Sequence, residues 1–528
     1  MKKIFFGFGR VVFNAFYFKI VLLLLSLGTV LVPLAGVSYR LLYIALVWGA
    51  VLCLQDLLTR RRFLAGRRSI LLLGFLAVFL VSVLLNRHNA FNLNFAGWAY
   101  AVFSLLVLYP DRIGGDRERA VREMSVLGNL YIGVTAILST VSFYMFIIQY
   151  ADVHRSEAGN YIIGWFENRL FGMYANPGLM MSVICIAVIL IQWELNRLKY
   201  PKTPWYSRLF WGYALAVNFF CMALENAYAA YISFGLFVAV TVFFKLRRTA
   251  ALKPRPDSKR RGAVILPAVL AAAAVAAVAG MIYGSRQVLP YLPALYTYSK
   301  ESASQPESSD TGPAEDNGGV SGTLEIPENT EAPQLQENAE IPASPAPAEE
   351  SKLDHVEIDR FPNDRDFLHG RMAIWKFGAE KFLEKPLFGH GPDSFRDYTG
   401  LTKIGLRHFH NLIVHTLVAV GAFGAVFIFT FLFLSFWEPL RRIWKQQAAE
   451  RYGGVILAVF AFLAMLAVNG MSEVTVLFLV RPSMFMFWYY LGYLTVLTND
   501  SRPSVFDRPA KALAAGMDKV LRRKRETG

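Results

Sequence analysis

The side chains of this chain that could do chemistry gather between Gly370 and Gly424. There the polar, aromatic segment GRMAIWKFGAEKFLEKPLFGHGPDSF leads into RHFHN and a long apolar run. Arginine keeps its charge and binds phosphate oxygens through two parallel hydrogen bonds. A histidine with an ordinary pKa of about 6.5 can take a proton from a hydroxyl at neutral pH. These residue types suit a reaction in which a hydroxyl loses its proton and a phosphate group departs.

His410 is the predicted general base of this segment. It precedes Asn411 where an apolar helix is expected to begin, and the nearby cation of Arg407 favours the neutral imidazole. A lone histidine at a helix start is more often a cap or an interfacial residue, so the His-Asn context carries the assignment. The possible helpers are three further histidines, His390, His408 and His415. His415 lies one to two turns into the helix and suits a buried polar contact equally well.

Composition places the chain in a membrane. Apolar residues make up 55% of it and charged residues only 18%, its mean hydropathy is +0.37, and runs such as Ile20 to Val32 carry no charge. These values are typical of an all-α integral membrane protein with many membrane crossings. The first apolar run has no clear signal-peptide cleavage site after it, so we expect it to be retained as the first helix.

The apolar stretches predict about twelve transmembrane helices, since about 20 residues are needed to cross the bilayer. Their centres lie near residues 27, 49, 78, 100, 137, 184, 216, 236, 272, 422, 461 and 488. An even number of crossings puts both termini on the same side of the membrane.

The distribution of Lys and Arg sets the orientation. Several connections and the tail from Arg522 to Arg525 are basic, so they and both termini are predicted to be cytoplasmic. The long loop between the ninth and tenth helices, with the candidate active site, then faces outward from a plasma or inner cell membrane. This orientation, and attraction to anionic membrane lipids, accounts for the net charge of +15, so no nucleic-acid partner is predicted.

The chain divides by composition into five predicted regions. Residues 1–283 form an N-terminal transmembrane region of nine helices, and residues 410–500 form three more. Between them lie an acidic insert rich in Pro, Glu and Ser at 284–360, predicted to be disordered, and an ordered outer loop at 361–409. Residues 501–528 form a basic cytoplasmic tail.

A short amphipathic helix is predicted in the ordered outer loop, from Leu368 to the stop at Pro386, with Asp366 as a candidate N-cap. Its apolar stripe recurs at helical spacing and consists of Met372, Trp375, Ala379, Phe382 and Leu383. The plain interpretation is a helix that lies on the outer membrane surface. Arg371, at the edge of the stripe, is well placed to meet a lipid phosphate.

Several motifs follow one another in a recognisable order. Gly-Arg, a Trp four residues later, Pro-Leu-Phe-Gly-His-Gly and a His-Asn pair that opens a helix running to Gly-Ala-Phe-Gly resemble the signature domain of the O-antigen ligase and O-antigen polymerase superfamily. The residues that carry this resemblance are Arg371, Trp375, Pro386, Gly389, Gly391, Phe395, His410, Asn411, Gly421 and Gly424. A second block, Asn168 to Gly172 followed by Asn176-Pro177, resembles the family's Arg-x-x-Gly and Asn-Pro element. The chain departs from the pattern at Leu224 to Ala227, where many members carry Ser-Arg-Gly, and at Gly178, where many carry a second Asn.

The resemblance implies a helical bundle of the GT-C-like type and a glycan transfer. The donor would be a glycan on undecaprenyl diphosphate, and the acceptor a hydroxyl of a polysaccharide, a lipid or a protein on the outer face. No nucleotide sugar, metal or other cofactor is implied, and the reaction would invert the anomeric carbon. His410 would be the catalytic base, and the donor diphosphate would be bound by Arg169, Arg371 and Arg407. The supporting residues would be Asn176, Asn411, Trp375 and Glu473.

Each of the charged candidates also has a plain interpretation. The positions of Arg169 and Arg371 are also typical of arginines whose side chains extend from a helix end to the membrane interface. Glu225 and Glu473 could orient His410 or hold an acceptor sugar, and they could equally be solvated carboxylates. The outer loops hold no Asp-containing pair of the kind that metal-dependent transfer needs, so no metal is predicted.

Two other classes of protein fit part of the pattern. A flippase for lipid-linked glycan also has about twelve spans, but it should carry mid-span charges and internal repeats, and the sequence shows neither. A membrane scaffold would bind partners through the acidic insert. Deleting residues 301 to 358 separates these classes, because an enzyme should survive the deletion and a scaffold should not. Among enzymes, ligase, polysaccharide polymerase and protein O-glycosyltransferase stay open.

Overall fold

The computed structural model describes most of the helical part of the chain. The described residues are 11–56, 58, 68–109, 116–156, 159–166, 168–197, 204–225, 228–251, 262–297, 371–396, 398, 408–445, 452–471, 474 and 476–498. Arg407, Glu473, Asp366, the basic tail and the predicted acidic insert from residue 298 onward lie outside this part.

Helices build most of the fold, as predicted. They are α2 Ala15–Thr29, α3 Ala35–Gln55, α5 Ser69–Leu85, α6 Phe91–Phe103, α7 Arg117–Ile147, α8 Pro177–Arg197, α9 Trp205–Glu225, α10 Tyr228–Ala251, α11 Gly262–Val288, α13 Arg371–Glu384, α14 Leu412–Trp444, α15 Gly453–Asn469 and α16 Pro482–Thr498. Short helical segments at Val32–Leu34, Ser104–Leu108 and Leu289–Tyr291 accompany them. Every predicted span centre falls inside one of these helices, and α11 continues past the boundary predicted at residue 283.

The described helices have the length and composition of a membrane protein. Eight of them are long and apolar enough to cross a bilayer, and three shorter apolar helices, α2, α5 and α15, lie among them. A largely helical membrane protein is therefore confirmed, while the count of twelve spans stays a prediction.

A small antiparallel sheet between α7 and α8 was not predicted. Its strands are β1 Ala151–Ser156, β2 Gly159–Phe166 and β3 Arg169–Gly172, in the order β1-β2-β3. The β2 sequence NYIIGWF is rich in aromatic and β-branched residues, which favour strands. At Gly164 the backbone has a φ of 94°, and a Cβ there would collide with the Tyr150 carbonyl. These strands are not visible in the sequence, because such short strands have no long alternating pattern to reveal them.

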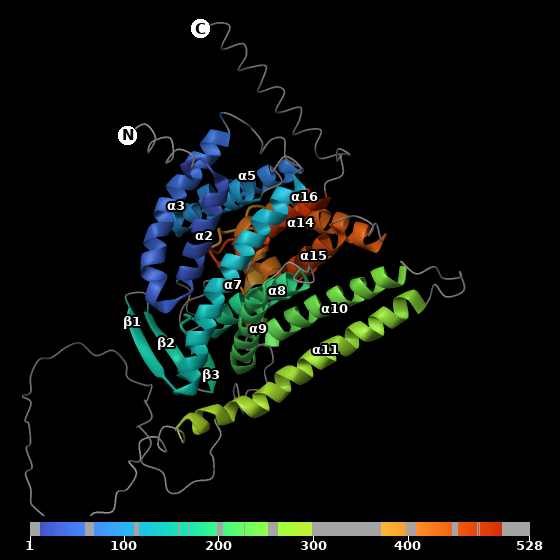
Figure 1. Cartoon of the computed structure of the whole chain (residues 1–528). Coiled ribbons are helices and arrows are strands. Elements are labelled where there is room, and N and C mark those ends of the chain that lie inside the picture. The colour runs from blue at the N-terminus through green and yellow to red at the C-terminus, as the bar shows by residue number, and fades with distance from the viewer. Residues whose placement is uncertain are drawn as a thin grey trace, which may run out of the picture.

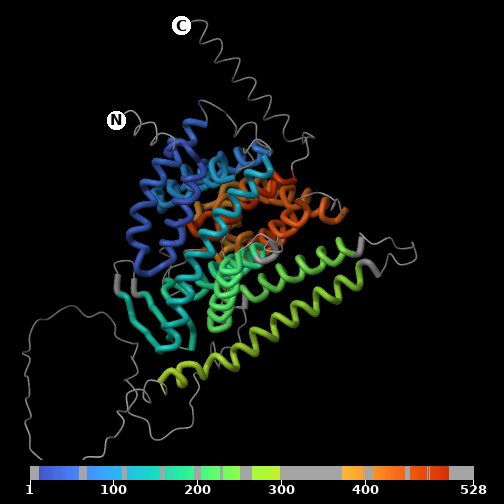
Figure 2. Tube along the Cα trace, in the orientation of Figure 1, coloured from blue at the N-terminus to red at the C-terminus, as the bar shows by residue number. Residues whose placement is uncertain are grey.

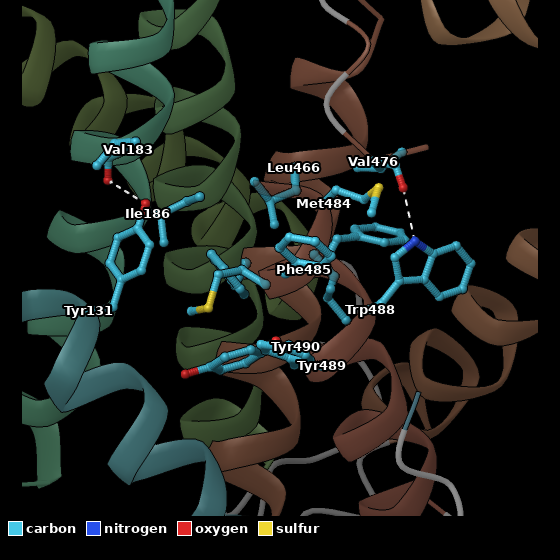
Figure 3. Packing of buried hydrophobic residues seen from close by; sticks show 14 of the residues in the cluster. Tyr131, Val183, Ile186, Leu466, Val476, Met484, Phe485, Trp488, Tyr489 and Tyr490 are labelled. Carbon is cyan, nitrogen blue, oxygen red and sulfur yellow. Dashed lines mark hydrogen bonds between the residues drawn. The ribbon is translucent and has the colours of Figure 1, made fainter. Parts of the chain in front are cut away.

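The core of the bundle surrounds α16. All residues of α16 from Pro482 to Thr498 are buried, as expected for a helix that is apolar on every face. Figure 3 shows its aromatic side chains packed together, with Trp488 Nε1 donating to the Val476 carbonyl at 2.9 Å. By contrast, α11 runs beside α10 along one flank (Figure 1), and most of its apolar side chains are exposed. These exposed side chains are suited to contact with lipid.

Ion pairs within the bundle join parts of the chain that are far apart in the sequence. Lys19 of α2 lies 3.5 Å from Glu123 of α7, whose carboxylate also accepts from Tyr493 of α16 at 3.0 Å. Arg68 lies 2.8 Å from Glu438 of α14. Figure 2 shows the same relation in the trace, where the blue N-terminal helices lie against the orange C-terminal ones. The helices thus carry more charge than predicted. These charged side chains lie near helix ends and form pairs inside the bundle, so they do not stand out in the sequence.

Candidate active site

The predicted amphipathic helix, α13, packs against the start of α14. Trp375 Nε1 donates to the Phe409 carbonyl at 3.1 Å. A Cβ at Gly378 would lie only 2.5 Å from Val414 Cγ1, so the absence of a side chain at this position permits the close approach of the two helices. The helix therefore lies directly beside the turn that contains His410.

The packed face of α13 overlaps the predicted stripe only in part. Ile374 is buried in a small cluster with Phe409 and Val418, and the α13 residues that pack against this cluster are Trp375, Phe377 and Phe382. By contrast, the residues of the predicted stripe that are exposed are Met372, Ala379 and Leu383. The helix itself was correctly predicted, and Trp375 and Phe382 of the stripe pack as expected. The stripe was wrong at its exposed members, because Gly378 lets a neighbouring face approach α14.

The Pro-Leu-Phe-Gly-His-Gly segment binds the backbone of α14 at a break in that helix. The N–H of His390 donates to the Val418 carbonyl at 2.8 Å, and the N–H of Ala422 donates to the Pro386 carbonyl at 2.7 Å. The break lies at Gly421, whose φ of 67° and ψ of −174° are not helical. The glycines of this motif therefore have a structural explanation. Side chains at Gly389 or Gly421 would collide with the backbone of the other segment.

Residues of α5 and of the loop that follows it hold this segment in place. Asn86 Nδ2 donates to the Gly389 carbonyl at 3.0 Å, and its side-chain oxygen accepts from Lys385. Ser82 Oγ donates to the Ala419 carbonyl at 2.8 Å. The break in α14 thus has its freed backbone groups satisfied from two sides, which a protein needs within a membrane.

Asn411 is the N-cap of α14. Its Oδ1 accepts from the N–H groups of Ile413 and Val414 at 2.9 and 3.2 Å, and its Nδ2 donates to the Met471 carbonyl at 3.0 Å. Both functions of the amide are therefore used within the protein. Asn411 fixes where α14 begins and hence where His410 stands.

His410 stands immediately before this cap in an uncommon backbone conformation. Its φ is 47°, in the left-handed region that non-glycine residues rarely occupy. Its ring lies 4.1 Å from the ring of His408, centroid to centroid, and the main-chain N–H of His410 donates to His408 Nδ1 at 3.3 Å. His410 is half-buried while His408 is buried. The two histidines form a compact pair of which His410 is the more accessible member.

Arg481 adds a cation to the histidine pair that sequence reasoning missed. Its Nη2 lies 3.5 Å from His408 Nε2, and Pro482 after it occupies the first position of α16. The signal available in the sequence was the Arg481-Pro482 pair at the start of α16. Arg407, which was predicted for this role, lies outside the described residues.

His390 is a structural member of the Pro-Leu-Phe-Gly-His-Gly segment. Its Nε2 lies 2.8 Å from the Lys381 carbonyl, and its ring packs edge-on against Phe395 at 5.2 Å. Burial lowers the pKa of His390, and the neighbouring charge of Lys385 acts in the same direction, whereas the hydrogen bond to Lys381 opposes them. A neutral imidazole that donates to a backbone carbonyl explains this position.

The second arginine block forms a separate group of contacts around β3. Arg169 Nη2 lies 3.1 Å from Glu225 Oε1, and the Glu225 side chain is completely buried at the end of α9. Asn176 accepts from the Gly178 N–H at 2.7 Å and caps the start of α8. Glu225 is thus the ion-pair partner of Arg169, which none of the alternatives considered from sequence had named.

The predicted residues are therefore gathered in two places. His410, Asn411 and Trp375 lie together where α13 meets α14, and Arg371 opens α13 one turn before Trp375. Arg169 and Asn176 lie around β3 and the start of α8. Within the described ranges, no group of three or more His, Cys, Asp or Glu side chains is arranged to hold a metal ion.

Comparison with known proteins agrees with the motifs. A search of curated proteins found no match. Residues 212–429 match the model of a family described as O-antigen ligase. The matched span runs from α9 into α14, so it includes Arg371, the Pro-Leu-Phe-Gly-His-Gly segment and His410, while Arg169 and Asn176 precede it. The match confirms, over residues 212–429, the resemblance to the O-antigen ligase superfamily that the motifs predicted.

Proposed function

We propose that the protein transfers a glycan from undecaprenyl diphosphate to an acceptor hydroxyl on the outer face of the membrane. The observation that carries the proposal is the His408–His410 pair, held at the capped start of α14 inside the family-matched span. His410, half-buried beside this cap, acts as general base on the acceptor hydroxyl. The deprotonated oxygen attacks the anomeric carbon in a single displacement, so the configuration at that carbon inverts.

The departing diphosphate is stabilised by arginines. Arg371 and Trp375 are four residues apart on α13 and therefore share a helix face. Because Trp375 is bonded to the Phe409 carbonyl, this arrangement supports an Arg371 side chain that reaches the region of His410. Guanidinium groups suit this task, since they match two phosphate oxygens at once and stabilise the charge that develops as the bond breaks. Arg407 is proposed for the same task from its position in the sequence.

Arg169 is proposed to bind the donor from the second group of contacts. Its pairing with Glu225 fixes the guanidinium near the end of α9. Asn176 caps the start of α8 in the same group of contacts. A guanidinium has five N–H donors, so one carboxylate contact leaves further donors for a phosphate. Glu473 is proposed to support the histidine pair from the segment between α15 and α16.

The acceptor class follows from this chemistry only in part. A polysaccharide, a lipid and a protein hydroxyl all present the same oxygen nucleophile to His410. The acceptor is therefore identified by the product, which is a longer polymer, a glycolipid or a glycoprotein. The protein would act in the plasma or inner membrane with its active site facing outward and both termini in the cytoplasm.

The proposal is tested by reconstituting the purified protein in liposomes with a lipid-linked glycan donor and each acceptor class in turn. Wild type should form product in the presence of a chelator, and His410→Ala should reduce the rate by about 100-fold or more at equal protein level. A variant that keeps the wild-type rate would remove His410 from the mechanism. Donor that crosses the bilayer without any product being formed would identify a flippase instead.

A further inference from the structure

His415 lies buried in the first turn of α14 with its hydrogen-bonding capacity unused. It is 1% exposed, and neither of its ring nitrogens has a hydrogen-bond partner among the residues that the structure describes. Its ring packs against Phe478 and Phe409, at centroid distances of 5.2 and 5.9 Å. A neutral imidazole offers one donor and one acceptor, and leaving both unmade in an apolar site costs stability. An orphaned polar group of this kind points to a partner that comes in another state of the protein.

His410 is the neighbour that can provide this partner. Both of its chain neighbours contact His415: the Asn411 carbonyl accepts from the main-chain N–H of His415 at 2.9 Å, and the Phe409 ring lies 5.9 Å from the His415 ring. In the resting protein the His410 ring is turned toward His408, and its backbone is held at a φ of 47°. A non-glycine residue is uncommon at this φ, and such backbone conformations cluster at functional sites. The backbone of His415 is fixed by comparison, because its main-chain N–H donates to the carbonyl of the N-cap residue Asn411 at 2.9 Å.

We propose that His415 is a positioning residue for His410, an inference that rests on the proposed function. In the loaded enzyme the His410 ring donates one N–H to a nitrogen of His415. The other His410 nitrogen takes the proton of the acceptor hydroxyl as the bond between that oxygen and the anomeric carbon forms. The bond between the anomeric carbon and the diphosphate oxygen breaks, and its electron pair leaves with the diphosphate. His410 keeps both protons as an imidazolium, while His415 stays neutral and fixes the orientation of the ring.

The competing interpretation is a histidine that only fills space between two phenylalanines. The two interpretations predict opposite results for His415→Phe. An aromatic ring of similar size fills the same site and removes two unpaired buried nitrogens, so the melting temperature should stay the same or rise in either case. A positioning role requires that the transfer rate nevertheless falls, by about ten- to a hundredfold. A space-filling role requires that the rate is unchanged.

Two conservative variants provide a measurement of the transfer rate that a change in packing alone would not explain. The amide of His415→Asn lies near the position of Nδ1, and that of His415→Gln lies near Nε2. One of them should restore more transfer than His415→Phe does, and this identifies the nitrogen that meets His410. The matched control is His390→Phe, which replaces a buried histidine whose Nε2 is already bonded to Lys381 and should therefore lower the melting temperature.

The experiment measures the melting temperature and the transfer rate of wild type and these variants in the same liposomes. A wild-type rate for His415→Phe overturns the inference and leaves the proposed function intact. Equal loss of transfer in all three His415 variants, together with lower melting temperatures, also overturns it, because His415 would then be structural. Absence of transfer by wild type itself overturns the proposed function, and the role of His415 falls with it. If His415→Phe does not fold, the transfer rates of His415→Asn and His415→Gln decide, because a positioning role requires that one of them exceeds the other.

Discussion

Arg169 and Glu225 form an ion pair between β3 and the end of α9, with Nη2 and Oε1 3.1 Å apart. The glutamate side chain is completely buried and that of the arginine is 15% exposed. A carboxylate is tolerated in such a place only with a partner, because its desolvation is costly. The pair therefore joins the small sheet to the bundle and also sets the orientation of the Arg169 guanidinium.

Removing one member of this pair should destabilise the protein more than removing both. Glu225→Gln leaves the Arg169 charge in a largely buried site without its carboxylate, at a cost of about 3–5 kcal/mol. The double variant Arg169→Met, Glu225→Leu removes both charges and should recover most of that loss. Thermal unfolding in detergent measures the difference. Equal melting temperatures for the single and double variants would contradict a buried pair.

The same double variant separates stability from donor binding. If Arg169 contacts the donor diphosphate as proposed, transfer should stay low in the stable double variant, with a raised apparent KM for the lipid-linked donor. Full recovery of the transfer rate together with the melting temperature would make Arg169 a purely structural residue.

Gly421 should not tolerate a side chain. Its backbone, at a φ of 67° and a ψ of −174°, lies in a region that only glycine occupies readily, and a Cβ would collide with the Leu387 carbonyl. Gly421→Ala should therefore lower the free energy of unfolding by about 2 kcal/mol or more. The matched control is Gly133 of α7, where a Cβ would meet nothing within 4 Å. Gly133→Ala should be neutral or stabilising by up to about 1 kcal/mol, since alanine is the better helix former.

Much of this fold could be predicted from composition, because apolar runs long enough to cross a bilayer have few alternatives to helix. Each predicted span centre lies in a helix for this reason. The sheet at β1 to β3 escaped prediction because its strands are short. The packing of Ile374 and Phe377 of α13 against the α14 region escaped prediction because it depends on a partner surface. The glycines of the family pattern were visible in the sequence. Their reason, the contact between the Pro-Leu-Phe-Gly-His-Gly segment and the break in α14, needed the structure.

The candidate site was predictable where chemistry is local and not where it depends on contacts between distant segments. The cap by Asn411 follows from its place before an apolar helix. The ion pair between Arg169 and Glu225 joins residues 56 positions apart, and Arg481 approaches His408 from 73 positions away. No pattern within one segment reveals such pairs. They depend on which helix ends the fold brings together.

Trp375 should contribute to stability and activity through one hydrogen bond. Trp375→Phe keeps an aromatic ring on α13 but removes the donor to the Phe409 carbonyl, at a cost of about 1 kcal/mol. Because Phe409 is next to His410, transfer should fall several-fold as well. Trp437, which is 51% exposed on α14, is the control, and Trp437→Phe should change neither quantity. An unchanged melting temperature for Trp375→Phe would show that the bond contributes nothing.

His390 should make the stability of the protein depend on pH below neutrality. Burial lowers its pKa in the folded protein below the ordinary value of 6.5. Above that value the histidine is neutral in both the folded and the unfolded chain, so its contribution to stability is fully present. As the pH falls through 6.5 the unfolded chain binds the proton more readily, and this contribution is lost progressively until the folded pKa is passed. His390→Gln keeps a donor for the Lys381 carbonyl but does not titrate. The melting temperature of wild type should therefore drop more than that of the variant between about pH 7.5 and pH 5, and parallel pH profiles of the two proteins would mean that His390 does not contribute.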